Sequence, residues 1–237
     1  VLLHGKNFCA ATWHDTALRL QMAGMRVIVP DQIGFCKSSK PISYEYSFAE
    51  LASNTHALLK SLKIDKATVL GHSMGGMTIM QLALDHPELF GSRIRGVALL
   101  STSPGGIRDI SLGLPPMAAK SLHRVLPVTA ALLVRNADVV EMGRSRVNDL
   151  SLLFTRLYSF GSTATDQASR FVASMVSATP IDVVAEFLPA LQEHDKRAVL
   201  GVFQGVELLV IVGDNDRLTP QEQSAEIVRH VPGAEYV

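Results

Sequence analysis

Residues 67–77 read ATVLGHSMGGM, and this stretch decides the fold class. Its first half is a short run of small and branched apolar residues, which is typical of a strand buried in a parallel sheet. Its second half opens an apolar helical pattern that continues to residue 84. The turn between them carries Ser73, whose hydroxyl would stand above the sheet at a helix N-terminus, where negative charge is favoured.

The alternative is an ordinary serine in a glycine-rich turn, because a bare G-x-S-x-G pattern is short enough to occur by chance. Here a strand precedes the pattern and a helix follows it. Gly71 and Gly75 also occupy the two places where so tight a turn has no room for a side chain. We therefore predict that Ser73 is a nucleophile.

Further apolar runs of strand length lie on either side of this unit, at residues 26–30 (RVIVP), 96–101 (GVALLS) and 206–213 (VELLVIVG). Helical patterns separate them. One of these patterns, residues 48–62, follows a capping box formed by Ser47 and Glu50, and Gly24 predicts the end of the first helix. This alternation indicates right-handed βαβ units. We predict an α/β fold with a mostly parallel sheet and helices on both faces.

Residues 107–189 contain helical patterns with Gly, Pro and Ser punctuation, but no run typical of a buried strand. An insertion of about 80 residues is far longer than the usual loop of about 2–6 residues. We therefore divide the chain into a core, residues 1–106 and 190–237, and a helical cap, residues 107–189, over the carboxyl end of the sheet. The apolar cap residues suit an apolar substrate group, or more simply the cap's own packing; they are Leu112, Leu114, Met117, Leu122, Leu132, Leu133, Leu152, Leu153 and Phe154.

Composition excludes several classes of protein. The chain has 237 residues, 47% of them apolar and 19% charged, which is typical of a globular domain. Its 22 basic and 22 acidic residues leave no excess charge for nucleic-acid phosphates. No apolar run approaches the roughly 20 residues that span a bilayer. Two cysteines are too few for a disulfide scaffold. We expect a cytoplasmic protein. We also expect its partner to be a small-molecule substrate.

Two other segments carry candidate site residues. The first strand ends in His4-Gly5, and the loop after it is placed to aim a backbone N–H at the serine. Paired with the N–H of Met74, such a donor would stabilise an oxyanion. His4 itself is more simply a histidine that fixes the loop than a catalytic base.

The second segment, residues 212–220 (VGDNDRLTP), follows the last complete strand. Asp214 and Asp216 are both candidates for the acid that orients a histidine. The alternative is a turn in front of a helix, with Thr219 as its cap and Pro220 at its first position. The functional interpretation is favoured because a serine nucleophile needs such an acid later in the chain.

These segments together resemble the α/β-hydrolase superfamily, in particular its serine esterases and lipases with a helical cap. The resemblance rests on LLHG, DQIGFCKSSKP, GHSMGG and GDNDRLTP and covers nearly the whole chain. It implies Ser73 as nucleophile, Asp216 as acid, and the backbone N–H groups of Lys6 and Met74 as oxyanion hole. It further implies that carboxylic esters are hydrolysed through an acyl-enzyme. Cys36 departs from the family pattern, which has a glycine at this place.

The resemblance also implies a catalytic histidine after the strand that follows the acid, and the sequence ends at Val237 within that strand. Only His230 follows Asp216, and it lies in a helical pattern that would point it away from the site. We therefore expect the chain to be a fragment of a hydrolase, cut at both ends, and to be impaired as it stands because the histidine is absent.

Other activities share the same triad and stay open: carbon–carbon bond hydrolase, haloperoxidase or perhydrolase, and lactonase. A non-catalytic ligand-binding protein on this fold is the alternative from another class. Neither metal-ligand spacing nor a dinucleotide fingerprint is present, so we expect no cofactor and no metal. We interpret Cys9 and Cys36 as small buried hydrophobes.

Overall fold

The computed structural model describes residues 1–41, 46–110, 117, 121, 125 and 165–237. At its centre is a five-stranded sheet in the order β1-β2-β3-β4-β5. All of its pairings are parallel, as the alternation of strands and helices predicts. The strands are β1 (Leu2–Leu3), β2 (Ala67–His72), β3 (Ile94–Leu100), β4 (Glu207–Ile211) and β5 (Glu235–Tyr236).

The strand predicted over residues 26–30 is wrong. These residues are not in a strand, although the segment passes beside β1, where the backbone N–H of Leu2 donates to the carbonyl of Ile28 at 2.9 Å. The β1 strand has two residues, so it offers little backbone for a ladder. Val27, Ile28 and Val29 are half-buried, whereas the prediction placed them in the interior.

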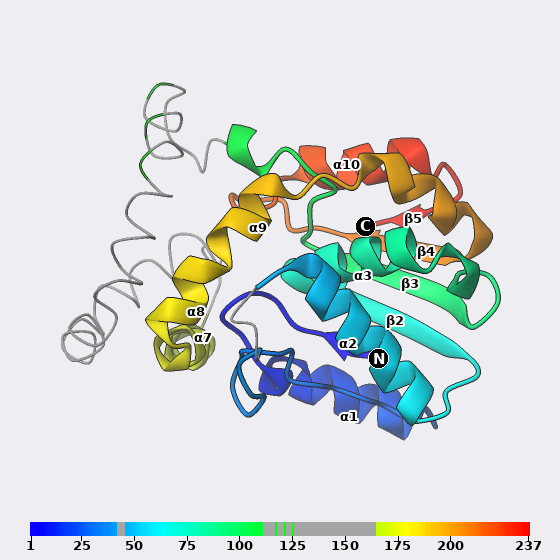
Figure 1. Ribbon diagram of the computed structural model, residues 1–237, viewed down its shortest axis with the longest axis horizontal. Coiled ribbons are helices and arrows are strands. Elements are labelled where there is room, and N and C mark those ends of the chain that lie inside the picture. The colour runs from blue at the N-terminus through cyan, green and yellow to red at the C-terminus, as the bar shows by residue number, and fades with distance from the viewer. Residues whose placement is uncertain (42–45, 111–116, 118–120, 122–124, 126–164) are drawn as a thin grey trace.

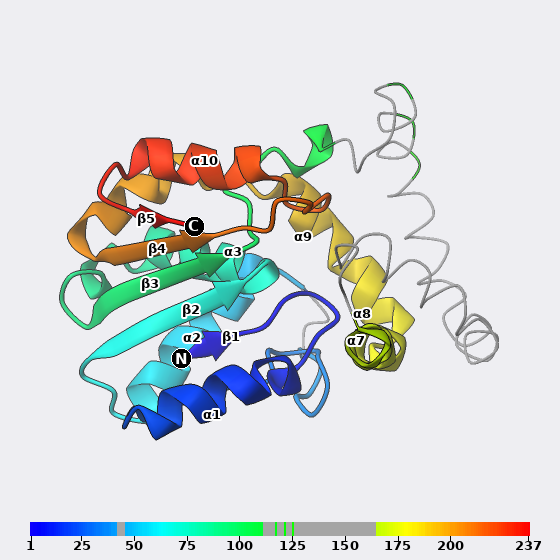
Figure 2. The ribbon, with the colours of Figure 1, turned by 180° about the vertical axis from the view of Figure 1, so that it is seen from behind.

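Helices cover both faces of the sheet (Figures 1 and 2). On one face lie α2 (Phe48–Ser61), α3 (Met74–Asp85) and α10 (Gln221–His230), and on the other lies α1 (His14–Met22). The main core lies between the sheet and the first of these layers and includes Leu59, Ile79, Leu99, Phe203 and Ile227, all fully buried. Short 3-10 helices complete this part: η1 (Ala10–Trp13), η2 (Pro87–Leu89), η3 (Ile107–Asp109) and η4 (Arg197–Gly205).

The helix ends follow the sequence signals in part. Ser47 caps α2, and its hydroxyl oxygen accepts the N–H of Glu50 at 3.1 Å. The Glu50 carboxylate accepts from the amide of Asn54 at 2.9 Å, so only one half of the predicted capping box is observed. Gly24 has a φ of +83° just after α1, the left-handed conformation expected at a helix end.

Three helices lie beyond the carboxyl ends of the strands: α7 (Asp166–Ala178), α8 (Ile181–Glu186) and α9 (Leu188–Glu193) (Figure 2). Phe187, between α8 and α9, attaches them to the rest of the molecule. Its ring lies edge-on against Phe35, Tyr46 and Phe48, at centroid distances of 6.2, 6.3 and 5.4 Å. Aromatic pairs at such distances add to the energy of burial.

Most of the predicted cap lies outside the described residues, including all of its named leucines and Phe154. Met117 is described and is exposed. The cap boundaries at 107 and 189 therefore stay a prediction.

No single helix in the described ranges has the length and apolar composition needed to cross a bilayer. One pair of helices, Asp166–Ala178 with Ile181–Glu193, meets both criteria only when taken together, and it bends by 90° at its break.

Candidate active site

The turn between β2 and α3 has the geometry that its sequence predicts. Ser73 has φ 51° and ψ −116°, a conformation that costs a non-glycine residue on the order of 1–3 kcal/mol. Two hydrogen bonds from the β3 side hold it: the N–H of Ser73 donates to the carbonyl of Leu100 at 2.9 Å, and the hydroxyl of Thr102 donates to the carbonyl of Ser73 at 2.7 Å. Hydrogen bonds to the end of β3 and to the residue shortly after it therefore hold the strained backbone of Ser73 in place.

Glycines are required around the turn because other atoms already fill the space. A Cβ on Gly71 would lie 2.5 Å from the backbone of Gly75, and a Cβ on Gly75 would lie 2.2 Å from the carbonyl oxygen of Leu3. A Cβ on Gly76 would lie 2.6 Å from the Thr102 hydroxyl. Each distance is shorter than van der Waals contact allows, so β1, β2 and α3 approach as closely as they do only because these residues lack side chains.

The strand register brings the predicted site loops to one edge of the sheet. His72 is opposite Leu100, and Leu100 is opposite Ile211. On the other side, Gly71 is opposite Leu3. Ser73, the loop after β1 and the loop after β4 therefore leave the sheet at the same level, which is where parallel α/β sheets place their sites.

His4 fixes the loop after β1. Its Nε2 accepts the N–H of Gln32 at 2.9 Å, its Nδ1 lies 2.8 Å from the carbonyl of Gly5, and its own carbonyl accepts from the Gln32 amide at 2.7 Å. The ring is fully buried, and this burial lowers its pKa. With both nitrogens engaged, His4 has the structural role that the sequence favoured, and not that of a base.

The loop that carries Lys6 lies against the residue that precedes Ser73. The ring of Phe8 stacks on that of His72 at 5.6 Å, and a Cβ on Gly5 would lie 2.8 Å from His72 Nδ1. The backbone N–H groups of Lys6 and Met74 have no hydrogen-bond acceptor among the described residues. Both predicted oxyanion donors are therefore free, and their catalytic role stays a prediction.

Burial also lowers the pKa values of Lys6 and His72 at this loop. It lowers the pKa of the Lys6 amino group to about 8, so this ammonium gives up its proton more readily than a surface lysine. Burial lowers the pKa of His72 to about 4, and the charge of Asp216 partly opposes that shift.

Asp216 is rigidly held, whereas Asp214 is exposed. One carboxylate oxygen of Asp216 accepts the N–H groups of Leu218 and Thr219 at 2.9 and 2.8 Å, and the other accepts the Thr219 hydroxyl at 2.8 Å. Asp214 accepts only from the Gln221 amide, at 3.0 Å. This difference supports Asp216 as the acid.

Thr219 has a role that sequence reasoning missed. The sequence predicts that it caps the last helix with Pro220 at the first helical position, but the cap residue of α10 is Pro220. The Thr219 hydroxyl is turned toward Asp216 instead. A carboxylate three residues before the threonine was the available signal, because it competes with the helix end for the same donor.

None of the described histidines forms a hydrogen bond with the Ser73 hydroxyl. His194 is buried with its Nε2 3.0 Å from the carbonyl of Ser103, and His56 and His86 face each other at 2.8 Å. His230 contacts the carbonyl of Glu226 on α10, in the helix where the sequence placed it. His123 lies outside the described residues.

The cysteines differ from their interpretation as buried hydrophobes. Cys36 is exposed, Cys9 is half-buried, and both are free thiols. Cys36 lies in a surface loop with a φ of 48°, which leaves the residue exposed although its sulfur contacts the carbonyl of Phe8.

The family model of the alpha/beta hydrolase fold matches residues 1–237. The chain belongs to the α/β-hydrolase family. It is 27% identical over 240 residues to the 2-hydroxy-6-oxo-6-phenylhexa-2,4-dienoate hydrolase of Burkholderia cepacia, covering 99% of this chain and 77% of that protein. The crystal structure of a probable hydrolytic enzyme from Pseudomonas aeruginosa PAO1 matches with a TM-score of 0.75 and 27% identity, covering 100% of this chain and 76% of that one.

An uncharacterized protein of Mycobacterium tuberculosis is 30% identical over 166 residues, which is 65% of this chain and 46% of that protein. The match thus spans about half of that relative. Membership of the α/β-hydrolase family agrees with the turn at Ser73 and the parallel sheet beneath it.

Proposed function

We propose that this α/β-hydrolase cleaves carboxylic esters, with Ser73 as the nucleophile and Asp216 as the acid of its triad. The observation that carries the proposal is the strained backbone of Ser73, with φ 51°, at the sheet edge that it shares with the loop of Asp216. Such strain persists where the surrounding structure enforces it, and it is concentrated at functional sites.

In the proposed reaction the Ser73 oxygen attacks the ester carbonyl carbon, and its proton passes to a base. The alcohol leaves with a proton, and water then hydrolyses the acyl-serine. The free N–H groups of Lys6 and Met74 would donate to the oxyanion in both steps. Asp216, held by three hydrogen bonds, would orient the base.

A test must allow for the base, because no described histidine forms a hydrogen bond with the Ser73 hydroxyl. A serine hydroxyl is a poor nucleophile without an adjacent base. We expect the 237-residue chain to hydrolyse p-nitrophenyl butyrate at or near the background rate. Added imidazole should then raise a rate that depends on Ser73.

The Ser73→Ala variant is the matched control, since it keeps the fold and measures the hydrolysis due to imidazole alone. We expect the imidazole-dependent rate of the native chain to exceed that of Ser73→Ala, and a fluorophosphonate probe, with imidazole present, to label only the native chain. Equal rates and equal labelling would contradict the proposal and favour a ligand-binding protein.

A carbon–carbon bond hydrolase is the second candidate. The match to one relative covers 77% of that relative's length, and the relative is named for hydrolysis of a phenylhexadienoate. Haloperoxidase, perhydrolase and lactonase activities rest on the same triad. The rates with a vinylogous diketone and with p-nitrophenyl butyrate distinguish carbon–carbon bond hydrolysis from ester hydrolysis. If Ser73-dependent turnover of the diketone is faster, carbon–carbon bond hydrolysis becomes the assigned activity.

A further inference from the structure

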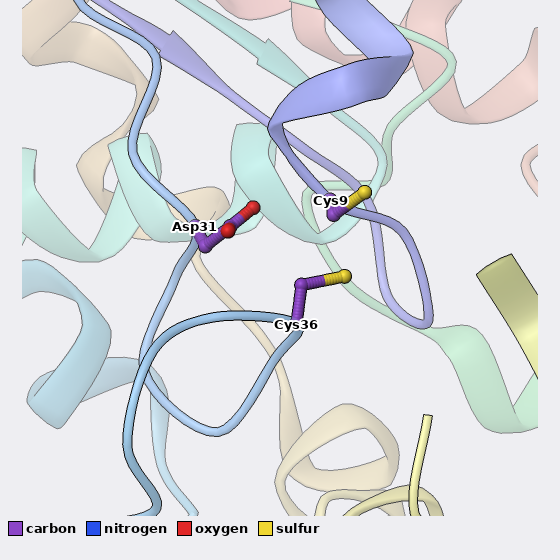
Figure 3. Close-up of side chains that lie close together, drawn as sticks. All are labelled: Cys9, Asp31 and Cys36. Atoms are coloured by element: carbon purple, nitrogen blue, oxygen red, sulfur yellow. The ribbon is translucent and has the colours of Figure 1, made fainter. Parts of the chain in front are cut away.

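Three side chains with metal-binding atoms gather in the loops that follow β1 and the segment 26–30 (Figure 3). Cys9 lies just before η1, Asp31 follows the segment 26–30, and Cys36 lies in the next loop. Their two sulfur atoms and a carboxylate oxygen all lie within 4.8 Å of one another. Within the described residues this is the one cluster of three such ligands.

We propose that Cys9, Asp31 and Cys36 bind a thiophilic divalent cation, of which Zn²⁺ and Cd²⁺ are examples. Two thiolates and a carboxylate suit such ions, whereas Mg²⁺ and Ca²⁺ prefer sites made of oxygen atoms. With Zn–S bonds of about 2.3 Å and tetrahedral angles, the two sulfurs would lie about 3.8 Å apart. The spread of 4.8 Å therefore needs shifts of only about 1 Å, which rotation of the exposed Cys36 side chain supplies.

Asp31 is already oriented for this role. One of its oxygens accepts the N–H of Ala10 at 2.7 Å, and the other accepts the N–H of Lys37 at 3.3 Å. Ala10 follows Cys9 and Lys37 follows Cys36, so the carboxylate is tied to the backbone beside both cysteines. A carboxylate has about four acceptor positions, and these two bonds leave free positions for a cation.

A third sulfur lies beside the cluster. The Met175 thioether, on α7, is 3.6 Å from the sulfur of Cys9 and 3.5 Å from the hydroxyl of Thr12. Thioethers and thiolates are both soft donors, so the surroundings of Cys9 favour a soft cation over a hard one.

Protons balance in the binding step. The cation forms two metal–sulfur bonds, the two thiols release two protons to solvent, and the ionised Asp31 adds a metal–oxygen bond. The net charge of the cluster is the same before and after, because two protons leave as a doubly charged ion enters.

The backbone of Cys36 provides a clean variant. Its φ of 48° lies in the region that glycine adopts without cost. Cys36→Gly therefore removes one ligand and relaxes the loop, so loss of binding cannot be attributed to unfolding.

The experiment is a titration of the reduced chain, kept in a phosphine reductant, with Cd²⁺ and with Zn²⁺. We expect one Cd²⁺ per chain, seen as ultraviolet sulfur-to-cadmium absorption, with release of two protons. In Cys36→Gly, binding should weaken by more than the 10–100-fold that is typical of losing a supporting residue. His86→Gln is the matched control, because His86 faces His56 at 2.8 Å and offers the rival nitrogen pair.

Binding unchanged in Cys36→Gly, or lost in His86→Gln, would overturn the proposal. So would a reduced chain that takes up no Cd²⁺, or a Cys9–Cys36 disulfide that persists in the reductant. The outcome is independent of the hydrolase assignment, since no residue of the proposed triad takes part.

Discussion

At the scale of single residues, the site depends on hydrogen bonds that fix each functional group before any substrate arrives. Thr102 holds the carbonyl of Ser73, Gln32 holds both ends of His4, and Thr219 holds Asp216. Gln32 and Thr219 lie within the motifs that identify the site, whereas Thr102 lies outside them. Removing one of them should therefore loosen a functional group without deleting it.

Thr219→Val tests this at Asp216. The change keeps the side-chain shape and the backbone N–H but removes the hydroxyl that donates to the carboxylate at 2.8 Å. A hydrogen bond to a charged group contributes about 1.5–3 kcal/mol, so we expect a loss of that order in the free energy of unfolding, measured with urea. Thr68→Val is the control: Thr68 is exposed on β2, and the change there should fall within about 0.5 kcal/mol. Equal losses would contradict this account.

At the scale of elements, β1, β2 and α3 meet where their glycines leave no free volume. The closest approach is between α3 and β1, at Gly75 and Leu3. Neither the Leu3 carbonyl oxygen nor a Cβ at position 75 could rotate away, because the backbone fixes the position of both. The position of the nucleophile between β2 and α3 thus also depends on β1, which is far from both in sequence.

Gly75→Ala should therefore lower the free energy of unfolding by about 1–3 kcal/mol or more, the usual cost of overpacking. Its Cβ would lie 2.2 Å from the Leu3 carbonyl oxygen. Gly201→Ala, in η4, is the matched control because nothing lies within 4 Å of its Cβ. Urea denaturation of the two variants measures the difference, and a Gly75→Ala variant as stable as Gly201→Ala would show that the contact is not real.

How much of the fold and of the site the sequence predicts depends on whether each feature is set by local or by distant contacts. The turn at Ser73 and strands β2, β3 and β4 follow from local patterns. The segment 26–30 has the same apolar pattern, yet its state depends on the length of β1 beside it. The sequence assigns Thr219 to the start of the last helix, but its hydroxyl donates to the Asp216 carboxylate instead. The helix pattern does not show which of these two partners the hydroxyl takes. The cluster of Cys9 and Cys36 comes from separate segments, so no spacing rule reveals it.

At the scale of the whole molecule, buried histidines make stability depend on pH. Burial lowers the pKa of both His72 and His194 to about 4, below the ordinary value of about 6.5. The unfolded chain therefore takes up protons at these sites before the folded chain does. Their contribution to stability is complete above about pH 6.5 and is lost as the pH falls toward 4.

We expect the free energy of unfolding to fall steadily between about pH 6.5 and 4. His194→Gln keeps an N–H donor for the carbonyl of Ser103 but removes one of the histidines whose pKa is lowered. Its stability should therefore depend less on pH over that interval, as measured by urea titrations at several pH values. A pH dependence as steep as that of the native chain would exclude His194 as a source.

The crowding at Gly76 and Thr102 has a consequence for the history of the fold. Thr102 must be small enough to leave room beside Gly76, and must keep a hydroxyl to reach the carbonyl of Ser73. A Cβ at 76 would lie 2.6 Å from the Thr102 hydroxyl oxygen and 2.7 Å from the Thr102 Cβ, and serine keeps both of these atoms. No residue that still supplies the hydroxyl makes room at 102, so descendants of a common ancestor that keep this hydroxyl are expected to keep glycine at 76.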